Sequence, residues 1–154
     1  MKKYELLTDE TLEVEGKTLF RIKALKTFKL SNGMEIVKGT EGGFIEKEHN
    51  LSHYGNAWVY GDARVDGDAW VSGDDIFTIS NIGSRNGTTT FFKTKNNKIA
   101  VTCGCFYGEI ETFAEKVKQT HGDNKHGRAY AKAIELAKVM IELKDLNVEV
   151  ADDK

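Results

Sequence analysis

The chain has 154 residues, of which 40% are hydrophobic and 30% charged, and its formal net charge is −2. This length suits one domain with its own core, and the near-neutral charge disfavours generic binding to DNA or to an anionic membrane. No apolar run approaches the roughly 18 residues of a bilayer-spanning helix, and the N-terminus lacks the apolar stretch of a signal peptide. We therefore expect a cytoplasmic protein with neither DNA nor a membrane among its partners.

The first part of the chain predicts a β-hairpin. Residues 1–16 are acidic and polar, and we expect a leading segment or a short strand there. Residues 17–38 alternate as strands do, interrupted by Ser31-Asn32-Gly33. An Asn-Gly pair between two alternating runs is a strong hairpin signal. The glycine-rich residues 39–43 then turn the chain into the next region.

A six-residue repeat follows. Glycine recurs at every sixth position, with Asn or Asp directly after it, alanine two residues after it and valine four residues after it. Its members are Gly55, Asn56, Ala57, Val59, Gly61, Asp62, Ala63, Val65, Gly67, Asp68, Ala69, Val71, Gly73 and Asp74. A helix repeats its apolar face every 3.6 residues, whereas this period is typical of a parallel β-helix of stacked short strands. Ile45, Leu51 and Phe77 are in phase with it, which predicts a solenoid of about two coils over residues 37–77.

The side chains between each alanine and valine are expected to point outward. They are Trp58, Arg64 and Trp70. Large exposed aromatic residues usually mark interfaces, although a stacking platform for a ligand is an alternative. Because two coils leave unpaired strand edges, we expect the hairpin to cover one end and the C-terminal half or another subunit to cover the other. The repeat thus predicts a homo-oligomer, either a dimer or a trimer or higher.

After residue 75 the period changes. β-Branched and aromatic residues predict three antiparallel strands at 75–80, 88–95 and 98–106, joined by turns. Apolar residues at helical spacing predict two helices, at 109–121 and from about 124 to 146. Their expected buried stripes are Ile110, Phe113 and Val117, then Tyr130, Ile134, Ala137 and Ile141. The predicted fold class is α+β: hairpin and short solenoid (1–77), β-meander with two helices (78–147) and a frayed tail (148–154).

The turn between the first two of these strands is the first candidate site. Ser84, Arg85 and Asn86 lie between two glycines and can donate hydrogen bonds to a phosphate or carboxylate, and the planar fork of arginine allows bidentate recognition. The alternative is an ordinary hairpin whose Arg85 pairs with a surface acid such as Glu109 or Glu111. The turn is not a Walker loop, since no Lys-Ser/Thr follows it.

Residues 103–108, CGCFYG, lead from the last strand toward the helices. Phe106 or Tyr107 can form a stacking wall there. We expect Cys103 and Cys105 to be small, buried or half-buried thiols in a reducing compartment, rather than a disulfide or a zinc site. A cysteine nucleophile with His121 or His126 as its base is an alternative.

The polar, cationic stretch 121–128 between the helices either closes over a bound anion or serves as an ordinary capped loop. The candidate ligand-binding residues are therefore Ser84, Arg85, Asn86, Lys93, Phe106, Tyr107, His121, Lys125 and Arg128. We expect no catalytic residue, no metal site and no cofactor.

Together these segments resemble a group of small phage-encoded proteins, in which hexads such as GNAWV and GDARV precede IGSRNGTTTFF, CGCFYG, THGDNKH and an AIELAK helix. The resemblance covers roughly residues 39–141. The hexads alone are also similar to hexapeptide-repeat acyltransferases, which place a catalytic histidine between the subunits of a trimer. His49 and His53 are the candidates for that alternative.

The C-terminal half also looks like phage proteins that sequester nucleotide immune signals with arginines and aromatic side chains at subunit interfaces. This resemblance implies a phage counter-defence protein that binds a cyclic nucleotide or a cyclic ADP-ribose-like signal without cleaving it. The alternatives are an enzyme, by acyl transfer or phosphodiester cleavage, and a structural oligomerisation protein.

Overall fold

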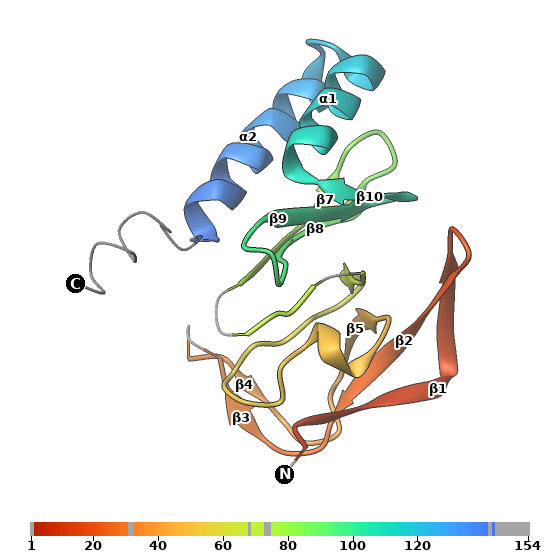
Figure 1. Cartoon of the computed structure of the whole chain (residues 1–154), viewed down its shortest axis with the longest axis vertical. Coiled ribbons are helices and arrows are strands. Elements are labelled where there is room, and N and C mark those ends of the chain that lie inside the picture. The colour runs from red at the N-terminus through yellow and green to blue at the C-terminus, as the bar shows by residue number, and fades with distance from the viewer. Residues whose placement is uncertain (1, 31–32, 68, 73–74, 142, 144–154) are drawn as a thin grey trace, which may run out of the picture.

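The computed structural model describes residues 2–30, 33–67, 69–72, 75–141 and 143. The fold class is α+β, as predicted, and both α-helices come at the C-terminal end (Figure 1). The strands are β1 (Tyr4–Val14), β2 (Lys17–Ala24), β3 (Phe28–Lys29), β4 (Glu35–Ile36), β5 (Glu41–Ile45), β6 (Arg64–Val65), β7 (Ile76–Ile82), β8 (Gly87–Lys93), β9 (Ile99–Cys103) and β10 (Phe106–Glu109). The helices are the short 3-10 helix η1 (Glu48–Asn50), α1 (Ile110–His121) and α2 (Lys125–Met140).

The sheet β10-β9-β8-β7 is the middle layer of the molecule. The helices α1 and α2 cover one of its faces, and the N-terminal half covers the other (Figure 1). Phe91 belongs to the hydrophobic core on the helix side and Phe92 to the core on the N-terminal side, and both are fully buried. Because neighbouring side chains of a strand point to opposite faces, one sheet contributes to two cores.

Residues 1–16 contain a long strand rather than a leading segment or a short strand. β1 pairs antiparallel with β2, and the turn between them consists of Glu15 and Gly16. Both turn residues have positive φ, 49° and 79°. A glutamate rarely adopts this conformation, and hairpin signals rest on Asn, Asp or Gly there, so the sequence carries no clear sign of this hairpin.

The hairpin predicted around residues 31–33 is confirmed by the pairing of β3 with β4, while Ser31 and Asn32 themselves lie outside the described residues. Its Phe28 ring packs edge-on against Trp58, with 5.5 Å between the ring centroids. The prediction that Trp58 points outward is therefore wrong. This hairpin covers the indole, which is only 3% exposed.

No hexapeptide-repeat helix forms in the described part of the chain. Parallel pairing is limited to β5 with β6 and to a bridge between Leu51 and Val71. The flanks of this irregular coil are occupied by other partners, because β2 pairs antiparallel with β5 and the amide of Trp70 donates to the carbonyl of Lys93. The repeat members Asp68, Gly73 and Asp74 lie outside the described residues.

The inward direction of the repeat's small apolar residues agrees with the sequence pattern. Each of them is at most 2% exposed: Ala57, Val59, Ala63, Val65, Ala69 and Val71. Gly42 and Gly43 of β5 lie directly against this coil, and a Cβ on Gly43 would come within 2.5 Å of the Ala63 carbonyl oxygen. The coil is therefore packed too closely against β5 to admit even one methyl group there.

The predicted antiparallel meander is present, with a fourth strand, β10, that the sequence analysis did not separate. Residues 104 and 105 form the turn between β9 and β10, and Gly104 has a φ of 58°. Cys103 is half-buried at the end of β9, whereas Cys105 is exposed on the turn. The expectation that both thiols would be at least half-buried is thus wrong for Cys105, because the turn projects it from the sheet.

Both predicted helices are present, and their predicted stripes are buried. Gly122 ends α1, and the side chain of Asn124 caps α2 by accepting a hydrogen bond from the Gly127 amide at 2.9 Å. α2 ends at Met140, before the predicted end near residue 146, and residues 144–154 with the predicted tail lie outside the described part. Neither α-helix is long and apolar enough to cross a membrane.

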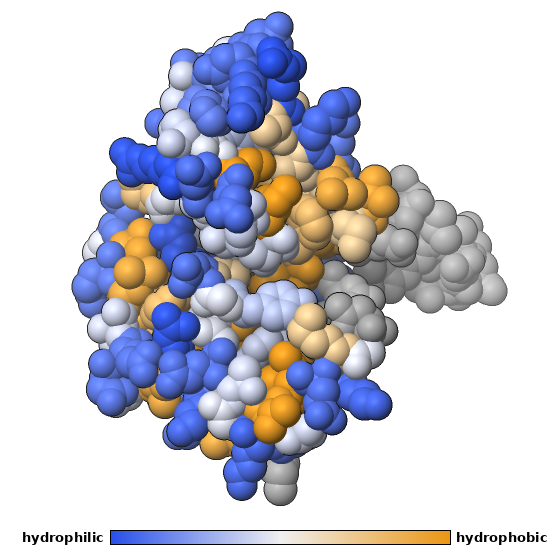
Figure 2. All heavy atoms as spheres, turned by 180° about the vertical axis from the view of Figure 1, so that it is seen from behind, coloured by the Kyte–Doolittle hydropathy of each residue, from blue (hydrophilic) through white to orange (hydrophobic). Residues whose placement is uncertain are grey.

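Large apolar side chains are exposed at several places, among them the β3–β4 hairpin with Met34 and Val37, the coil and the end of α2. Figure 2 shows apolar surface beside the end of α2, where Leu136, Val139 and Met140 are 46–70% exposed. On the coil, Tyr54 and Trp70 are also largely exposed. Such residues are typical of interfaces, and the homo-oligomer stays a prediction.

Candidate functional site

A cavity of about 830 Å³ lies where the sheet, α1 and the N-terminal half meet. Its walls come from the β7–β8 turn, the β9–β10 turn, α1, one residue of α2 and the chain just before and within β6. The turn between β1 and β2 reaches it through Glu15. The cavity therefore unites segments that are far apart in the sequence.

The β7–β8 turn brings Ser84, Arg85 and Asn86 to the cavity, as the sequence analysis proposed. The amide of Asn86 donates to the Gly83 carbonyl at 3.1 Å, and both residues have positive φ, 52° and 85°. Asparagine and glycine adopt that conformation most readily, which explains why this sequence makes a tight turn here. All three side chains are exposed at the mouth of the cavity.

An aromatic wall forms the helix side of the cavity. The Phe113 ring lies 5.3 Å from that of Phe106 and meets the Tyr130 ring edge-on at 5.5 Å. The imidazole of His121 stacks on Tyr130, with ring centroids 5.7 Å apart. All four rings line the cavity, so a flat ligand can contact aromatic surface there.

The Tyr130 hydroxyl reaches under the β7–β8 turn. It lies so close to Gly83 that a Cβ there would overlap it, and its oxygen is 3.5 Å from the Cys103 sulfur. Cys103 also accepts a hydrogen bond from the buried Thr89 hydroxyl at 3.2 Å. Burial, together with the contact to Cys103, raises the pKa of Tyr130 to about 12. This hydroxyl therefore stays protonated at neutral pH and supports the turn from below.

Three cationic side chains line the cavity: Arg64, Arg85 and Lys116. None of them forms an ion pair with another described residue. The alternative that Arg85 pairs with Glu109 or Glu111 is thus not what the structure shows, and Glu109 instead pairs with Lys98 at 3.4 Å. The three charges are available to an anionic ligand.

The backbone of Arg64 is fixed against the central sheet. Its amide donates to the Thr90 hydroxyl at 3.3 Å, and the buried Thr102 hydroxyl donates to its carbonyl at 2.7 Å. Burial lowers the pKa of the half-buried guanidinium, an effect that the nearby Asp66 carboxylate opposes. The backbone that carries the Arg64 guanidinium is therefore held in place. Asp66 lies near this guanidinium but does not form an ion pair with it.

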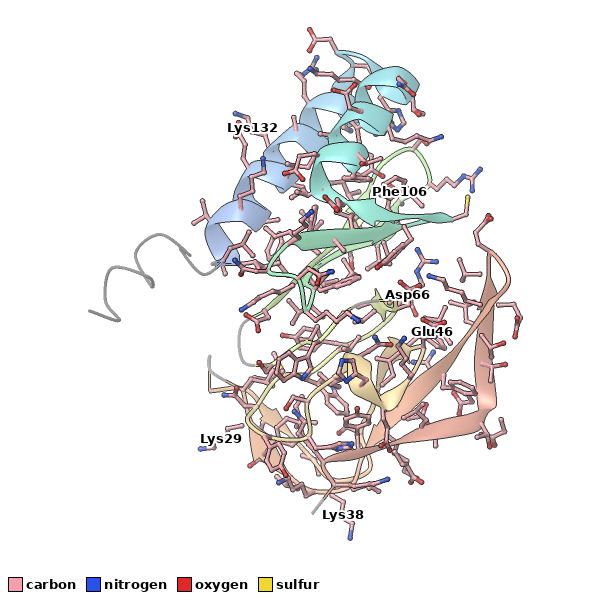
Figure 3. All side chains as sticks on the ribbon, in the orientation of Figure 1. Lys29, Lys38, Glu46, Asp66, Phe106 and Lys132 are labelled. Atoms are coloured by element: carbon pink, nitrogen blue, oxygen red, sulfur yellow. The ribbon has the colours of Figure 1, made fainter. Side chains whose placement is uncertain are left out.

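Asp66 lies below the sheet, on the side opposite Phe106, with Glu46 beside it (Figure 3). It is 4% exposed, its Oδ2 is 4.0 Å from the Lys17 ammonium, and burial raises its pKa. Lys17 also lies over the Tyr107 ring, 4.2 Å from its centroid. These contacts dock the β1–β2 hairpin against β10 at the edge of the cavity.

The structure brings six of the nine predicted ligand-binding residues to this cavity: Ser84, Arg85, Asn86, Phe106, Tyr107 and His121. Phe106 and Tyr107 are neighbours on β10 and point to opposite faces. Phe106 is part of the aromatic wall, whereas the Tyr107 hydroxyl lies against Gly67 on the N-terminal side. Of the two alternatives, Phe106 is the better stacking surface.

Lys93, Lys125 and Arg128 lie outside the cavity lining. Lys93 ends β8, six residues beyond Gly87, and at about 3.3 Å per residue this is about 20 Å from the turn. The Arg128 guanidinium donates to the Asp123 carbonyl at 2.6 Å, within its own loop. Three ligand-binding residues were predicted in the segment 121–128, and of these His121 alone lines the cavity.

The sequence analysis missed several lining residues, including Arg64, Phe113, Lys116 and Tyr130 as ligand contacts. A signal for Lys116 was present, because it lies three residues after Phe113 and is therefore its neighbour on the surface of α1, although Lys116 itself is exposed. Arg64 shared its repeat position with two tryptophans, so nothing in the repeat distinguished it.

The alternative acyltransferase histidines lie away from this cavity lining. His53 stacks on Tyr4 with 4.1 Å between the ring centroids, and its Nδ1 accepts a hydrogen bond from the Lys3 amide at 3.0 Å. Burial lowers the pKa of His53. His49 stacks on the exposed Trp70. Both contacts indicate that His49 and His53 have a structural role in the N-terminal half.

Comparison of the chain with protein-family models, with curated proteins and with solved structures finds no match.

Proposed function

We propose that this protein binds a small anionic ligand with an aromatic ring, of nucleotide type, in the cavity beneath the β7–β8 turn and holds it without cleaving it. The observation that carries the proposal is the joining of three cations without ion pairs, Arg64, Arg85 and Lys116, to a wall of four rings. The planar fork of arginine pairs bidentately with phosphate, and a nucleobase is a flat group that stacks on aromatic rings.

The dimensions support such a ligand. Pockets for small molecules measure roughly 300–1,000 Å³, and this cavity has about 830 Å³. Each charge-assisted hydrogen bond contributes about 1.5–3 kcal/mol. Several such bonds together with a stacked base are enough for the tight binding that sequestration requires.

Two thiols line the cavity, Cys103 and Cys105, and binding is favoured over cleavage by the environment of Cys103. The sulfur of Cys103 contacts the hydroxyls of Thr89 and Tyr130 rather than an imidazole. His121, the proposed base of the alternative mechanism, stacks face to face on the Tyr130 ring. Hydroxyls that stay protonated do not activate a thiol by removing its proton.

The biological part of the proposal rests on the resemblance to phage proteins. In that setting the ligand is a nucleotide immune signal, such as a cyclic oligonucleotide or a cyclic ADP-ribose variant. The protein works in the host cytoplasm as a homo-oligomer and lowers the free concentration of the signal.

The test is to titrate the purified protein with cyclic dinucleotides, cyclic trinucleotides and cyclic ADP-ribose in a calorimeter. The protein is then heat-denatured, and the released ligand is analysed by chromatography. We expect one of these classes to bind and to return intact. Binding of none of them contradicts the proposal, and release of an altered ligand favours the enzyme alternative.

Variants at Arg85 and Arg128 distinguish binding in the cavity from a general effect of the protein's charge. Arg85→Ala should weaken binding about 10-fold to 100-fold, which corresponds to the loss of one charge-assisted contact. Arg128→Ala removes the same charge outside the cavity, where the guanidinium contacts the Asp123 carbonyl. It should leave the affinity within a factor of about two. Equal losses in both variants contradict the assignment of the site.

A further inference from the structure

Two carboxylates, Glu15 and Asp62, line the same cavity as the three cations. Neither forms an ion pair with another described residue. A cavity that selected only for phosphate would gain nothing from two acids, because like charges repel the ligand. We therefore expect the two carboxylates to contact a part of the ligand other than its phosphate.

The two acids and two of the three cations reach the cavity from different parts of the fold. Glu15 and Asp62 belong to the N-terminal half, whereas Arg85 is on the β7–β8 turn and Lys116 on α1. Arg64 comes from the N-terminal half, two residues after Asp62. A ligand that fills the cavity thus meets Arg85 and Lys116 from the C-terminal half, and Arg64 together with the two acids from the N-terminal half.

The position of Asp62 is fixed by its neighbours. Gly61 before it has a φ of 56°, and the amide of Ala63 after it donates to the Tyr60 carbonyl at 3.0 Å, which closes a tight turn. Ala63 is fully buried, and the following Arg64 is clamped to the sheet through its backbone. The backbone of Asp62 is therefore held in a tight turn, and its exposed side chain lines the cavity.

Glu15 is positioned by the docked hairpin. It has a φ of 49° at the tip between β1 and β2. Two residues on, Lys17 holds the tip through its contacts with the Tyr107 ring and with Asp66. Both acids thus belong to segments that are held against the rest of the molecule.

We propose that Asp62, assisted by Glu15, accepts hydrogen bonds from the sugar hydroxyls of the ligand, so that the site selects ribonucleotides over deoxyribonucleotides. This inference rests on the proposed function. An ionised carboxylate only accepts hydrogen bonds, and the free hydroxyls of a ribose are neutral donors that a nucleotide carries besides the amino groups of its base. Acid-to-ribose contacts of this kind recur in nucleotide-binding folds. The cations then hold the phosphate, and the acids hold the sugar.

The experiment measures the affinities of ADP, 2′-deoxy-ADP and inorganic pyrophosphate for the wild-type protein and for Asp62→Ala, with Asp123→Ala as a control acid in the loop between the helices. The wild type should bind ADP about tenfold more tightly than 2′-deoxy-ADP, the value of one charge-assisted hydrogen bond. Asp62→Ala should reduce that ratio to about one, and it should bind pyrophosphate more tightly because a repulsive charge is gone. Asp123→Ala should behave as the wild type.

The increase in pyrophosphate affinity separates recognition from a structural role, since a damaged site would bind both ligands less well. Equal affinity of the wild type for ADP and 2′-deoxy-ADP overturns the inference but leaves the proposed function standing. Selectivity that survives Asp62→Ala and Glu15→Gln together also overturns it. Failure of the wild type to bind any nucleotide, including the cyclic ones, overturns the proposed function as well.

Discussion

The two sides of the central sheet are packed in different ways. On the N-terminal side, small alanine and valine side chains of the coil fill the space closely, and the crevice beside Asp66 holds only about 20 Å³. On the helix side, large rings and a tight glycine-containing turn enclose part of a cavity of about 830 Å³. The small side chains of the coil are close-packed, as protein interiors are in general, whereas the rings around Phe113 border open space. The N-terminal half thus provides close packing, and the helix side provides the aromatic wall of a site that Arg64, Asp62 and Glu15 of the N-terminal half complete.

The largest expected effect comes from two neighbouring phenylalanines on opposite faces of β8. Phe→Ala in a core costs about 3–5 kcal/mol, depending on how far the site can collapse. Phe92→Ala should fall near the upper end, because the coil against it is held on both flanks. Phe91→Ala should fall near the lower end, because the helices can move toward the vacated space. Urea denaturation of both variants measures the difference, and the reverse order would contradict the contrast between the two sides.

A smaller effect is expected at the contact between the turn and α2. Gly83→Ala places a methyl group against the Tyr130 hydroxyl at a φ of 85°, which should cost about 1–3 kcal/mol and weaken ligand binding. Gly55→Ala is the matched control in the coil, since its φ is 76° but nothing lies within 4 Å of the new Cβ. Gly55→Ala should lose only the stability that an alanine sacrifices by adopting a positive φ.

Tyr130→Phe tests the same contact from the other side. In the double variant with Gly83→Ala, removal of the hydroxyl should restore part of the lost stability, so that the two changes are not additive. Thermal midpoints of the two single variants and the double variant measure this coupling. Strict additivity would show that the overlap does not cause the loss.

The smallest expected effect is a dependence of stability on pH in the N-terminal half. Lys3 is fully buried, its ammonium donates to the Ala57 carbonyl at 2.6 Å, and burial lowers its pKa to about 8. Between pH 8 and its ordinary value of 10.5 the unfolded chain binds more protons at Lys3, so stability should rise with pH there. The gain should end near pH 10, because the raised pKa of the Tyr4 hydroxyl acts in the opposite direction above its ordinary value.

Lys3→Met should remove this rise. The urea midpoint of the wild type should increase from pH 7.5 to pH 9.5, and that of the variant should stay level over the same range. A variant that retained the full increase would assign the effect to another group.

Much of the fold could be predicted because its signals are local. The inward alanines and valines, the Asn124 cap and the stripe of α1 each depend on residues a few positions apart. The β1–β2 hairpin could not be predicted, because Glu15 adopts a conformation that its side chain disfavours and that only the docked hairpin stabilises. The β-helix prediction failed because, among the described residues, parallel pairing is limited to β5 with β6 and to the bridge between Leu51 and Val71. The covering of the two flanks by β2 and by the central sheet agrees with the expectation that the hairpin and the C-terminal half cap the coil.

The candidate site could be predicted in part. Arg85 was found because a short polar turn between glycines is visible in the sequence, whereas Arg64 was not, because it shares its repeat position with Trp58 and Trp70. Arg128 was proposed on charge alone, and its contact with the Asp123 carbonyl is visible only in the structure.

By itself the sequence determined the α+β class with two C-terminal helices, the inward face of the repeat and the turn that carries Arg85. Only the tertiary structure decided that Arg64 and Arg85 line one cavity and that Trp58 is covered. The physical reason is distance along the chain. Periodicity and turn chemistry act over a few residues, while the cavity depends on how the hairpin, the coil and the helices dock on the two faces of one sheet.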